Sequence, residues 1–236
     1  MSRTLIGIAA VLVAILFLLR KYRRLRERRR REPERFFARS LSVIEHGEFQ
    51  STGAVGYPRL VGRYRGLPVQ VLPVIDTLPA RRLPALWLLV TVQSTLPTQA
   101  RFDLMMRPTA ATTFSNFDLL PVTVPVPPGF PEGAVLRTDD PEHMIPPHVV
   151  TPHLDVFQNV RAKELLITPN GVRLVWLMAE ADRARYGVFR DADFGDADLD
   201  PDLLRDLLDR LIALRQSILD SPQSGAPRKT IACSSM

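Results

Sequence analysis

The 236-residue sequence contains a single cysteine, Cys233, near its C-terminus. One cysteine excludes a disulfide framework and a thiolate metal cage within the chain. The sequence also lacks the patterns GxSxG, HExxH, GxxxxGK(S/T) and GxGxxG. These patterns are the common signatures of a serine nucleophile, a zinc protease and a phosphate-binding loop. Their absence argues against these three classes and does not bear on enzymes built on other residue sets.

Charge is absent from residues 4–19, which read TLIGIAAVLVAILFLL. Eleven of these sixteen residues are Leu, Ile, Val or Phe. At about −0.3 to −0.6 kcal/mol each, they favour insertion into a bilayer by roughly 5 kcal/mol. No small-x-small cleavage pattern follows Leu19, as it would in a secretory signal peptide. The sequence therefore predicts a membrane anchor over residues 1–19, with Thr4–Leu19 as a transmembrane helix.

A basic block, residues 20–31, follows this stretch with a single acid, Glu27. Cytoplasmic flanks of membrane spans carry the excess of Lys and Arg. The chain is therefore expected to be a single-pass protein of the bacterial inner membrane, with its N-terminus outside and its soluble domain in the cytoplasm. Basic side chains in this position are expected to contact anionic lipid headgroups. They are Arg20, Lys21, Arg23, Arg24, Arg26, Arg28, Arg29, Arg30 and Arg31.

The rest of the chain has no excess of positive charge. The formal net charge is +6, of which Arg3 contributes +1 and residues 20–31 contribute +8, so that −3 is left for residues 32–236. A nucleic-acid-binding domain has a strongly basic surface. No nucleic-acid partner is therefore expected, and a protein of unspecified identity is the expected partner besides the membrane.

Hydrophobic periodicity and turn residues divide the chain into further parts. Residues 20–47 are expected to be a juxtamembrane segment that ends in a short helix from Glu34 to His46. Residues 48–220 are expected to form one cytosolic α+β domain. Residues 221–236 have few apolar side chains and are expected to be disordered.

Within the domain, most apolar runs have the length and residue types of strands. Arg65-Gly66 and Asn170-Gly171 each separate two such runs and predict hairpins, the second with a type I′ turn. Pro68 and Pro73 suggest that the second run is an edge strand or bulged. The predicted strands are Leu60–Tyr64, Val69–Ile75, Leu86–Val92, Arg101–Met106, Glu164–Thr168 and Val172–Met178.

Helical signals are fewer than strand signals. A shorter helix is expected after Thr151. Asp200 is a typical N-cap for a Leu-rich amphipathic helix, Pro201–Leu219, which should pack on the sheet. The predicted fold class is therefore α+β, with an N-terminal transmembrane helix followed by a mostly antiparallel sheet and a few helices packed on it.

Two interpretations are open for the acids before Pro141. Asp139 and Asp140 could act with His143 and His148 in a hydrolase or transferase site, because paired carboxylates and imidazoles are suited to acid–base chemistry. Alternatively, Asp140 caps a helical turn that begins at Pro141. The five-residue spacing of His143, His148 and His153 rotates by about 140° on a helix, so no metal site and no cofactor is predicted.

The segment from Pro121 to Pro131 contains five prolines in eleven residues. It is expected to be an extended surface loop, or else a docking segment for a partner that recognises polyproline. Without a converging acid, base and nucleophile, the function expected is a membrane-anchored cytosolic interaction or scaffold domain. No catalytic residue is assigned, and the hydrolase or transferase is the alternative.

Several motifs resemble a group of uncharacterised bacterial single-pass membrane proteins with a cytosolic α+β domain of unknown function. They are GRYRGLPVQV (62–71), RTDDP (137–141), KELLITPNGVRLVW (163–176) and the Leu-rich C-terminal helix. The likeness covers about residues 58–219. It implies the anchor and the fold class, and no activity.

Overall fold

The computed structural model of the chain describes residues 35–52, 57–77, 83–108, 111–182, 186, 192, 194 and 197–221. These residues form one nine-stranded sheet with the order β1-β2-β3-β4-β9-β8-β5-β7-β6, in which every neighbouring pair is antiparallel. The strands are β1 Glu45–Gln50, β2 Arg59–Tyr64, β3 Leu67–Asp76, β4 Ala85–Gln93, β5 Phe102–Met106, β6 Val122–Val124, β7 Ala134–Thr138, β8 Ala162–Thr168 and β9 Gly171–Glu180.

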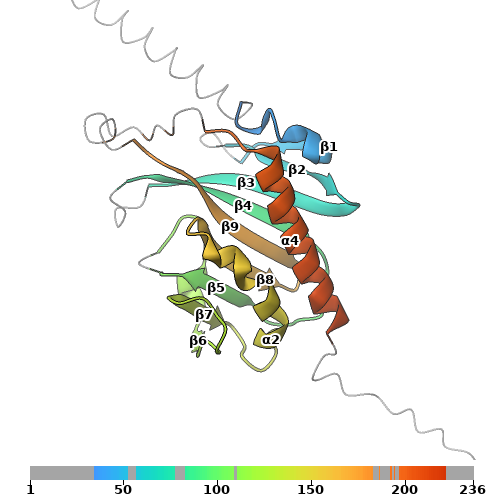
Figure 1. Cartoon of the computed structure of the whole chain (residues 1–236), viewed down its shortest axis with the longest axis vertical. Coiled ribbons are helices and arrows are strands. Elements are labelled where there is room, and N and C mark those ends of the chain that lie inside the picture. The colour runs from blue at the N-terminus through green and yellow to red at the C-terminus, as the bar shows by residue number, and fades with distance from the viewer. Residues whose placement is uncertain are drawn as a thin grey trace, which may run out of the picture.

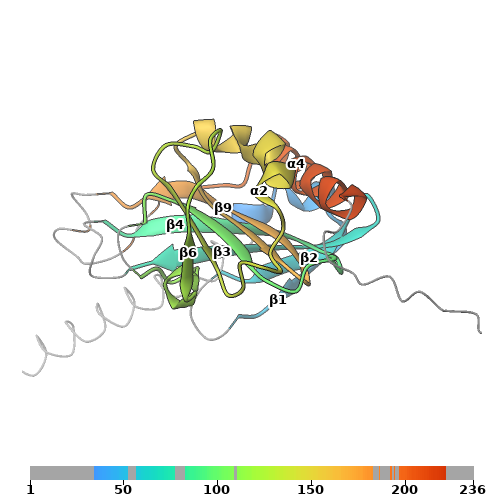
Figure 2. The same cartoon turned by 90° about the horizontal axis from the view of Figure 1, so that it is seen from below.

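The helices α2, η3 and α4 lie together on one face of this sheet (Figures 1 and 2), whereas the short turn η2 packs on the opposite face. Leu86, Leu88 and Val90 of β4 point to this face and belong to the main hydrophobic core, together with the leucines of α4. The alternate residues of β4, which include Trp87 and Leu89, belong to a second and smaller core on the opposite face. The helical elements are η1 Leu41–Val43, η2 Phe117–Leu119, α2 Pro147–Val150, η3 Thr151–Gln158 and α4 Pro201–Asp220.

The long helix α4 confirms the prediction made from its sequence. Asp200 is its N-cap, and the Asp200 side chain accepts a hydrogen bond from the Asp202 backbone N–H at 3.2 Å. Pro201 fills the first turn, where its missing N–H costs no intrahelical bond. The helix packs across β4 and β9 (Figure 1). Its buried side chains are Leu204, Leu207, Leu208, Leu211, Leu214 and Ile218.

The β2–β3 hairpin is confirmed, with Arg65 and Gly66 at its corner. Their φ values are 48° and 76°, the two positive angles of a type I′ turn. The expectation that β3 is an edge strand is wrong, because β3 lies between β2 and β4. Its pairing with β2 ends at Val71, so Pro73 occupies a stretch that pairs with β4 alone.

The β8–β9 hairpin is also present, but its corner is not the one predicted. Thr168 pairs with Gly171, which places Pro169 and Asn170 at the turn, and Asn170 does not have a positive φ. Gly171 has φ 146° and begins β9. A Cβ at Gly171 would lie 2.3 Å from the Val92 carbonyl oxygen, so the glycine lets β9 approach β4 closely.

The helix expected from Glu34 to His46 is not formed over its second half. The 3₁₀ turn η1 ends at Val43, and β1 starts at Glu45. His46 has φ 53°, and the register of β1 against β2 shifts between Glu45 and Glu48. A left-handed residue at such a shift is typical of a β-bulge, which the helical spacing of apolar residues does not predict.

The predicted fold class needs correction. The chain is mainly an antiparallel sheet with few helices, and no helix of the described residues is long and apolar enough to cross a membrane. The longest helix, α4, is amphipathic, with Arg205 and Asp206 exposed on its outer side. The predicted transmembrane helix Thr4–Leu19 lies outside the described residues, and the single-pass topology and inner-membrane location gain no support from the structure.

Other predictions also fall on residues that are not described. The basic block at 20–31 and almost all of the predicted tail at 221–236 lie there. The proline-rich segment 121–131 is described, and part of it differs from the expected loop. Its residues 122–124 form β6, which pairs with β7 at one edge of the sheet.

Candidate functional site

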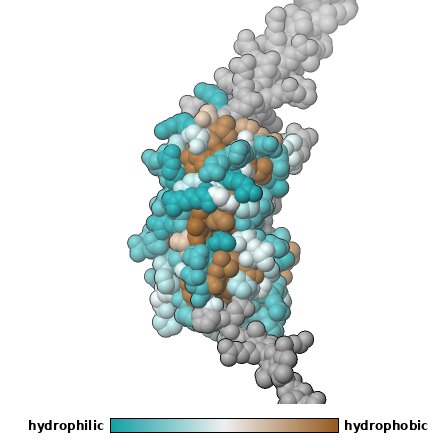
Figure 3. All heavy atoms as spheres, turned by 90° about the vertical axis from the view of Figure 1, so that its right-hand side faces the viewer, coloured by the Kyte–Doolittle hydropathy of each residue, from teal (hydrophilic) through white to brown (hydrophobic). Residues whose placement is uncertain are grey.

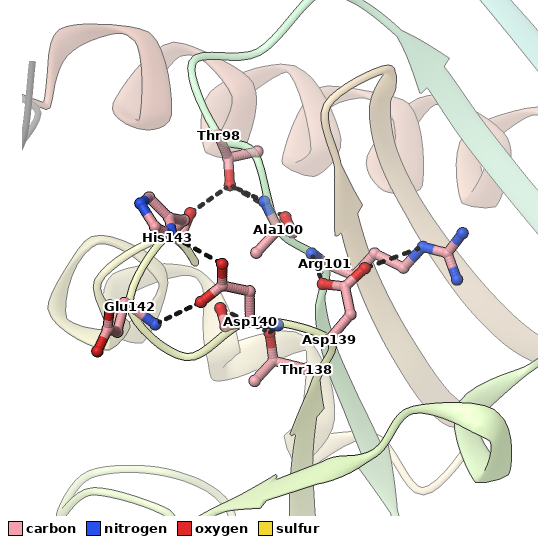
Figure 4. Close-up of polar contacts among 8 residues, drawn as sticks. All are labelled: Thr98, Ala100, Arg101, Thr138, Asp139, Asp140, Glu142 and His143. Carbon is pink, nitrogen blue, oxygen red and sulfur yellow. Dashed lines mark hydrogen bonds and ion pairs between the residues drawn. The ribbon is translucent and has the colours of Figure 1, made fainter.

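The two acids of the predicted site follow β7 directly and turn in different directions (Figure 4). Asp139 Oδ1 accepts a hydrogen bond from the Arg101 backbone N–H at 2.7 Å, and Asp139 Oδ2 lies 3.7 Å from Arg101 Nε. Asp139 therefore joins the end of β7 to the start of β5. This is a structural role for a half-exposed carboxylate.

Asp140 instead faces His143. Asp140 Oδ2 lies 2.7 Å from His143 Nδ1, and both side chains are about half exposed. Asp140 Oδ1 accepts a hydrogen bond from the Glu142 backbone N–H at 3.0 Å. The pKa of Asp140 lies below its ordinary value, mainly because of the hydrogen bond with His143 and to a smaller extent because of that from Glu142. Asp140 thus caps a turn, as the second interpretation expected, and it also orients an imidazole.

The other histidines lie elsewhere. His148 is exposed on the short helix α2, and no hydrogen bond of the described residues joins it to Asp139, Asp140 or His143. His153 Nε2 lies 2.9 Å from Ser217 Oγ of α4, and desolvation by burial lowers the pKa of His153. Within the described ranges, no group of three His, Cys, Asp or Glu side chains is arranged to hold a metal ion.

The structure therefore brings two of the four predicted residues together. An Asp–His pair can orient a general base, but nucleophilic catalysis also needs a hydroxyl or thiol within hydrogen-bond reach of that base. In the described part of the chain, no hydrogen bond joins the His143 imidazole to a Ser, Thr or Cys side chain. The pair is also exposed, so it lacks the desolvation that strengthens electrostatic catalysis.

A second polar cluster lies on the face of the sheet opposite α4, and the sequence did not suggest it. Asp103 of β5 and Glu164 of β8 are 2% and 0% exposed. They lie on neighbouring strands, where Asp103 pairs with Leu166 and Glu164 with Met105, so the two acids are diagonal neighbours in the ladder. Asp103 Oδ1 and Glu164 Oε2 have no hydrogen-bond donor among the described residues. Two carboxylates cannot donate to each other, and only a protonated carboxyl group supplies the O–H donor that this buried pair lacks.

Arginines and a serine surround this acid pair. Arg173 Nη2 of β9 donates to Glu164 Oε1 at 3.1 Å, and Ser115 Oγ donates to the same oxygen at 2.6 Å. Arg137 of β7 lies directly opposite Asp103 in the ladder. The pKa of Asp103 is raised to about 9. The largest cause is desolvation by burial, and smaller ones are the repulsion from Glu164 and a hydrogen bond with it. The positive charges of Arg173 and Arg101 oppose this shift more weakly.

In the sequence, the two acids of this cluster are visible only as single acids beside apolar residues. Asp103 and Glu164 are single acids within the apolar runs FDLMM and ELLI. Acids in such runs are solvated when their face of the sheet is exposed to water. Asp103 and Glu164 are buried because β5 and β8 are interior strands. Strand order, which periodicity does not reveal, therefore decides whether they form a site.

Hydrophobic side chains also reach the surface of the sheet domain. On the side shown in Figure 3, they are divided into separate patches by hydrophilic side chains. Two of the exposed apolar residues, Leu41 and Phe49, lie at or next to the edge strand β1. The exposed large hydrophobic residues of the described chain are Leu41, Phe49, Leu119, Val126, Val160 and Leu219.

The chain matches no protein-family model and no curated protein. Among solved structures it is similar to the crystal structure of the mycobacterial trehalose monomycolate transport factor A, TtfA. The TM-score is 0.46 and the sequence identity 10%, over 83% of this chain and 100% of that chain. A likeness at this level carries no argument about function. The resemblance to a group of bacterial proteins, drawn above from residues 62–71 and 163–176, stays a prediction.

Proposed function

We propose that the chain is a protein-interaction domain that binds an extended segment of a partner along the outer edge of β1. The exposure of this strand supports the proposal most directly. Five of its six residues are exposed, and within the described sheet it pairs only with β2. An edge strand with unpaired N–H and C=O groups can accept a further strand through main-chain hydrogen bonds.

The two edges of the sheet differ in what they offer. The opposite edge is the three-residue strand β6, which lies between Pro121 and Pro125. Proline has no N–H, so this edge has few donors for an added strand. β1 contains no proline, and its regular pairing with β2 runs from Glu48 to Gln50. The bulge at His46 limits added pairing to this short stretch.

The side chains beside this edge indicate the chemistry of the partner. Phe49 is 44% exposed and Leu41 is 37% exposed, and both can be covered by an apolar side chain. The Phe49 ring is held in place by Phe37, at 5.5 Å between ring centroids. Glu48 is exposed and forms no ion pair among the described residues. An extended segment that alternates apolar residues with Lys or Arg fits this surface.

Selection of ten-residue peptides from a random library against the full chain tests the proposal. Peptides with alternating apolar and basic residues are expected. Phe49→Ala should weaken their binding about 10-fold to 100-fold, because burial of a Phe side chain contributes about 1.5–3 kcal/mol. Val160→Ala, at a site that is 79% exposed and distant in sequence, is the matched control and should leave binding unchanged. Binding is measured by fluorescence anisotropy.

Methylation of the peptide backbone nitrogens separates strand addition from simple apolar contact. N-methylated peptides should bind at least tenfold more weakly if main-chain hydrogen bonds to β1 are formed. Equal binding of methylated and unmethylated peptides, or equal binding to Phe49→Ala and to the unaltered chain, would show that β1 is not the site.

The hydrolase or transferase is a second candidate, and one observation favours it: the contact between Asp140 and His143. If this pair works as a general base, the chain should hydrolyse an activated ester or phosphoester such as a p-nitrophenyl derivative. Asp140→Asn and His143→Gln should each lower that rate by about 10²-fold to 10⁴-fold. Asp139→Asn is the control, because Asp139 faces Arg101. A rate equal to the uncatalysed one for the unaltered chain would remove this candidate.

A further inference from the structure

The face of the sheet opposite α4 is covered by a strap, residues 111–120. Phe114 and Phe117 of the strap are buried in the second hydrophobic core with Trp87, Leu89 and Val175 of the sheet. The Phe114 and Trp87 rings are 4.9 Å apart between centroids. Two aromatic side chains thus anchor the strap over an apolar surface that β4 and β9 would otherwise expose.

Few hydrogen bonds hold the strap to the sheet. Two of its backbone N–H groups donate hydrogen bonds within local turns. The Leu119 N–H donates to the Asn116 carbonyl oxygen, and the Leu120 N–H donates to the Phe117 carbonyl oxygen. The strap is no part of any strand ladder. A segment with few backbone bonds to its neighbours has a low local free energy of opening.

Side chains of the acid cluster supply most of the remaining contacts. Ser115 Oγ donates to Glu164 Oε1 at 2.6 Å and accepts from the Phe117 backbone N–H at 3.1 Å. Arg137 Nη1 donates to the Asp118 carbonyl oxygen at 3.1 Å, and its guanidinium carbon lies 5.2 Å from the centre of the Phe117 ring. The cluster therefore joins the sheet to the strap.

A buried pair of acids lowers the stability of a fold, so its presence points to a role other than stability. Replacement of buried charged groups by apolar residues is often neutral or stabilising, and strongly perturbed carboxyl groups gather at functional positions. The charged groups around the pair come from each packed strand: Arg173 from β9, Arg137 from β7 and Arg101 next to β5. Arg101 is also paired with Asp139, and Arg137 is directed to the strap.

We propose that the strap is a proton-dependent cover, closed while Asp103 and Glu164 share one proton and opened when that proton is lost. With the proton present, a carboxyl–carboxylate hydrogen bond satisfies the pair, and Glu164 Oε1 accepts from Ser115. Loss of the proton leaves two negative charges side by side in a buried site, where their repulsion is strong. Entry of water relieves it, and the strap is the adjoining element with the fewest backbone bonds. Opening exposes Trp87 and Leu89.

Hydrogen exchange of the strap amides between pH 7 and pH 9, corrected for intrinsic exchange, tests this proposal on the full chain. The fraction of open strap should rise by up to about tenfold per pH unit, because one proton is released on opening. In a Trp176→Phe background, acrylamide quenching of Trp87 fluorescence should increase in parallel. Asp103→Asn, which keeps a donor toward Glu164, should abolish both responses. Asp139→Asn, an exposed acid with an Arg101 contact, should retain them.

Amides of α4 separate opening of the strap from unfolding of the whole chain. At each pH they should stay much better protected than the strap amides, because α4 packs on the other face and its buried amides exchange only when the whole chain unfolds. Equal free energies of opening for strap and α4 amides at each pH, or the same pH response in Asp103→Asn as in the unaltered chain, would overturn the proposal. If Asp103→Asn does not fold, Glu164→Gln replaces it, since the glutamine oxygen can still accept from Ser115. In that variant Asp103 still titrates without the repulsion from Glu164, so a pH response as large as in the unaltered chain would overturn the proposal equally.

Discussion

Replacement of Gly171 by alanine is expected to lower the free energy of unfolding by about 3–5 kcal/mol. The glycine has φ 146°, which L-residues rarely adopt, and such strain costs about 1–3 kcal/mol. The added Cβ would also lie 2.3 Å from the Val92 carbonyl oxygen and 3.1 Å from the Gln93 Cα. Backbone atoms of a central strand cannot move aside as a side chain can, so β9 has to separate from β4.

Gly66→Ala is the matched control for this prediction. Gly66 has φ 76°, and a Cβ there would have no neighbour within 4 Å. The control therefore carries only the left-handed strain of about 1–2 kcal/mol. Urea denaturation of both variants measures the difference. An equal loss in the two variants would mean that the close approach of β9 to Val92 does not contribute to stability.

The free energy of unfolding is expected to fall by about 2 kcal/mol between pH 7 and pH 9. The pKa of Asp103 is raised from 3.8 to about 9 in the folded chain. In this window the folded state binds one proton more than the unfolded state, so stability decreases by up to about 1.4 kcal/mol per pH unit. The contribution is fully present below pH 3.8 and is lost as the pH rises through 9.

Asp103→Asn should remove this slope, because an amide does not titrate. The measurement is made above pH 7 to avoid an opposite contribution from His153. The pKa of His153 is lowered in the folded chain, so this residue makes the free energy of unfolding rise with pH only up to about its ordinary pKa of 6.5. Denaturant midpoints at pH 7, 8 and 9 for the two proteins give the comparison. Parallel curves would show that Asp103 does not hold a proton in the folded chain.

Local patterns in the sequence were sufficient for much of the sheet. The β2–β3 turn at Arg65-Gly66, the doubly buried strand β4 and the capped helix α4 follow from turn chemistry, apolar runs and capping residues within a few positions of each other. These signals depend on neighbouring residues alone, and the folded chain keeps them.

Features that depend on distant parts of the chain were predicted less well. Phe37, Leu41 and Ile44 have helical spacing, but packing under α4 and pairing with β2 convert the end of this segment into η1 and β1. Asn170-Gly171 is typical of a type I′ turn, yet Gly171 lies in β9 instead, against the backbone of Val92. In both cases tertiary packing overrides a valid local preference.

The candidate sites show the same division. The contact between Asp140 and His143 is local, three residues apart, and proximity in the sequence was enough to suggest it. Asp103 and Glu164 are 61 residues apart and meet only because β5 and β8 are neighbours. Without strand order, nothing in the sequence distinguishes Glu164 from an exposed acid on a sheet surface.

The strand order also has a consequence for how the chain is made. β4 pairs with β9, which begins 78 residues after β4 ends. A ribosome therefore releases β4, apolar on both faces, long before its partner exists, and the edge that β9 will occupy stays open meanwhile. Pairings of such long separation form slowly, and open apolar strands invite association between nascent chains. Chains that end before residue 162 should consequently aggregate, and full-length chains should fold only after the β8–β9 hairpin has left the ribosome.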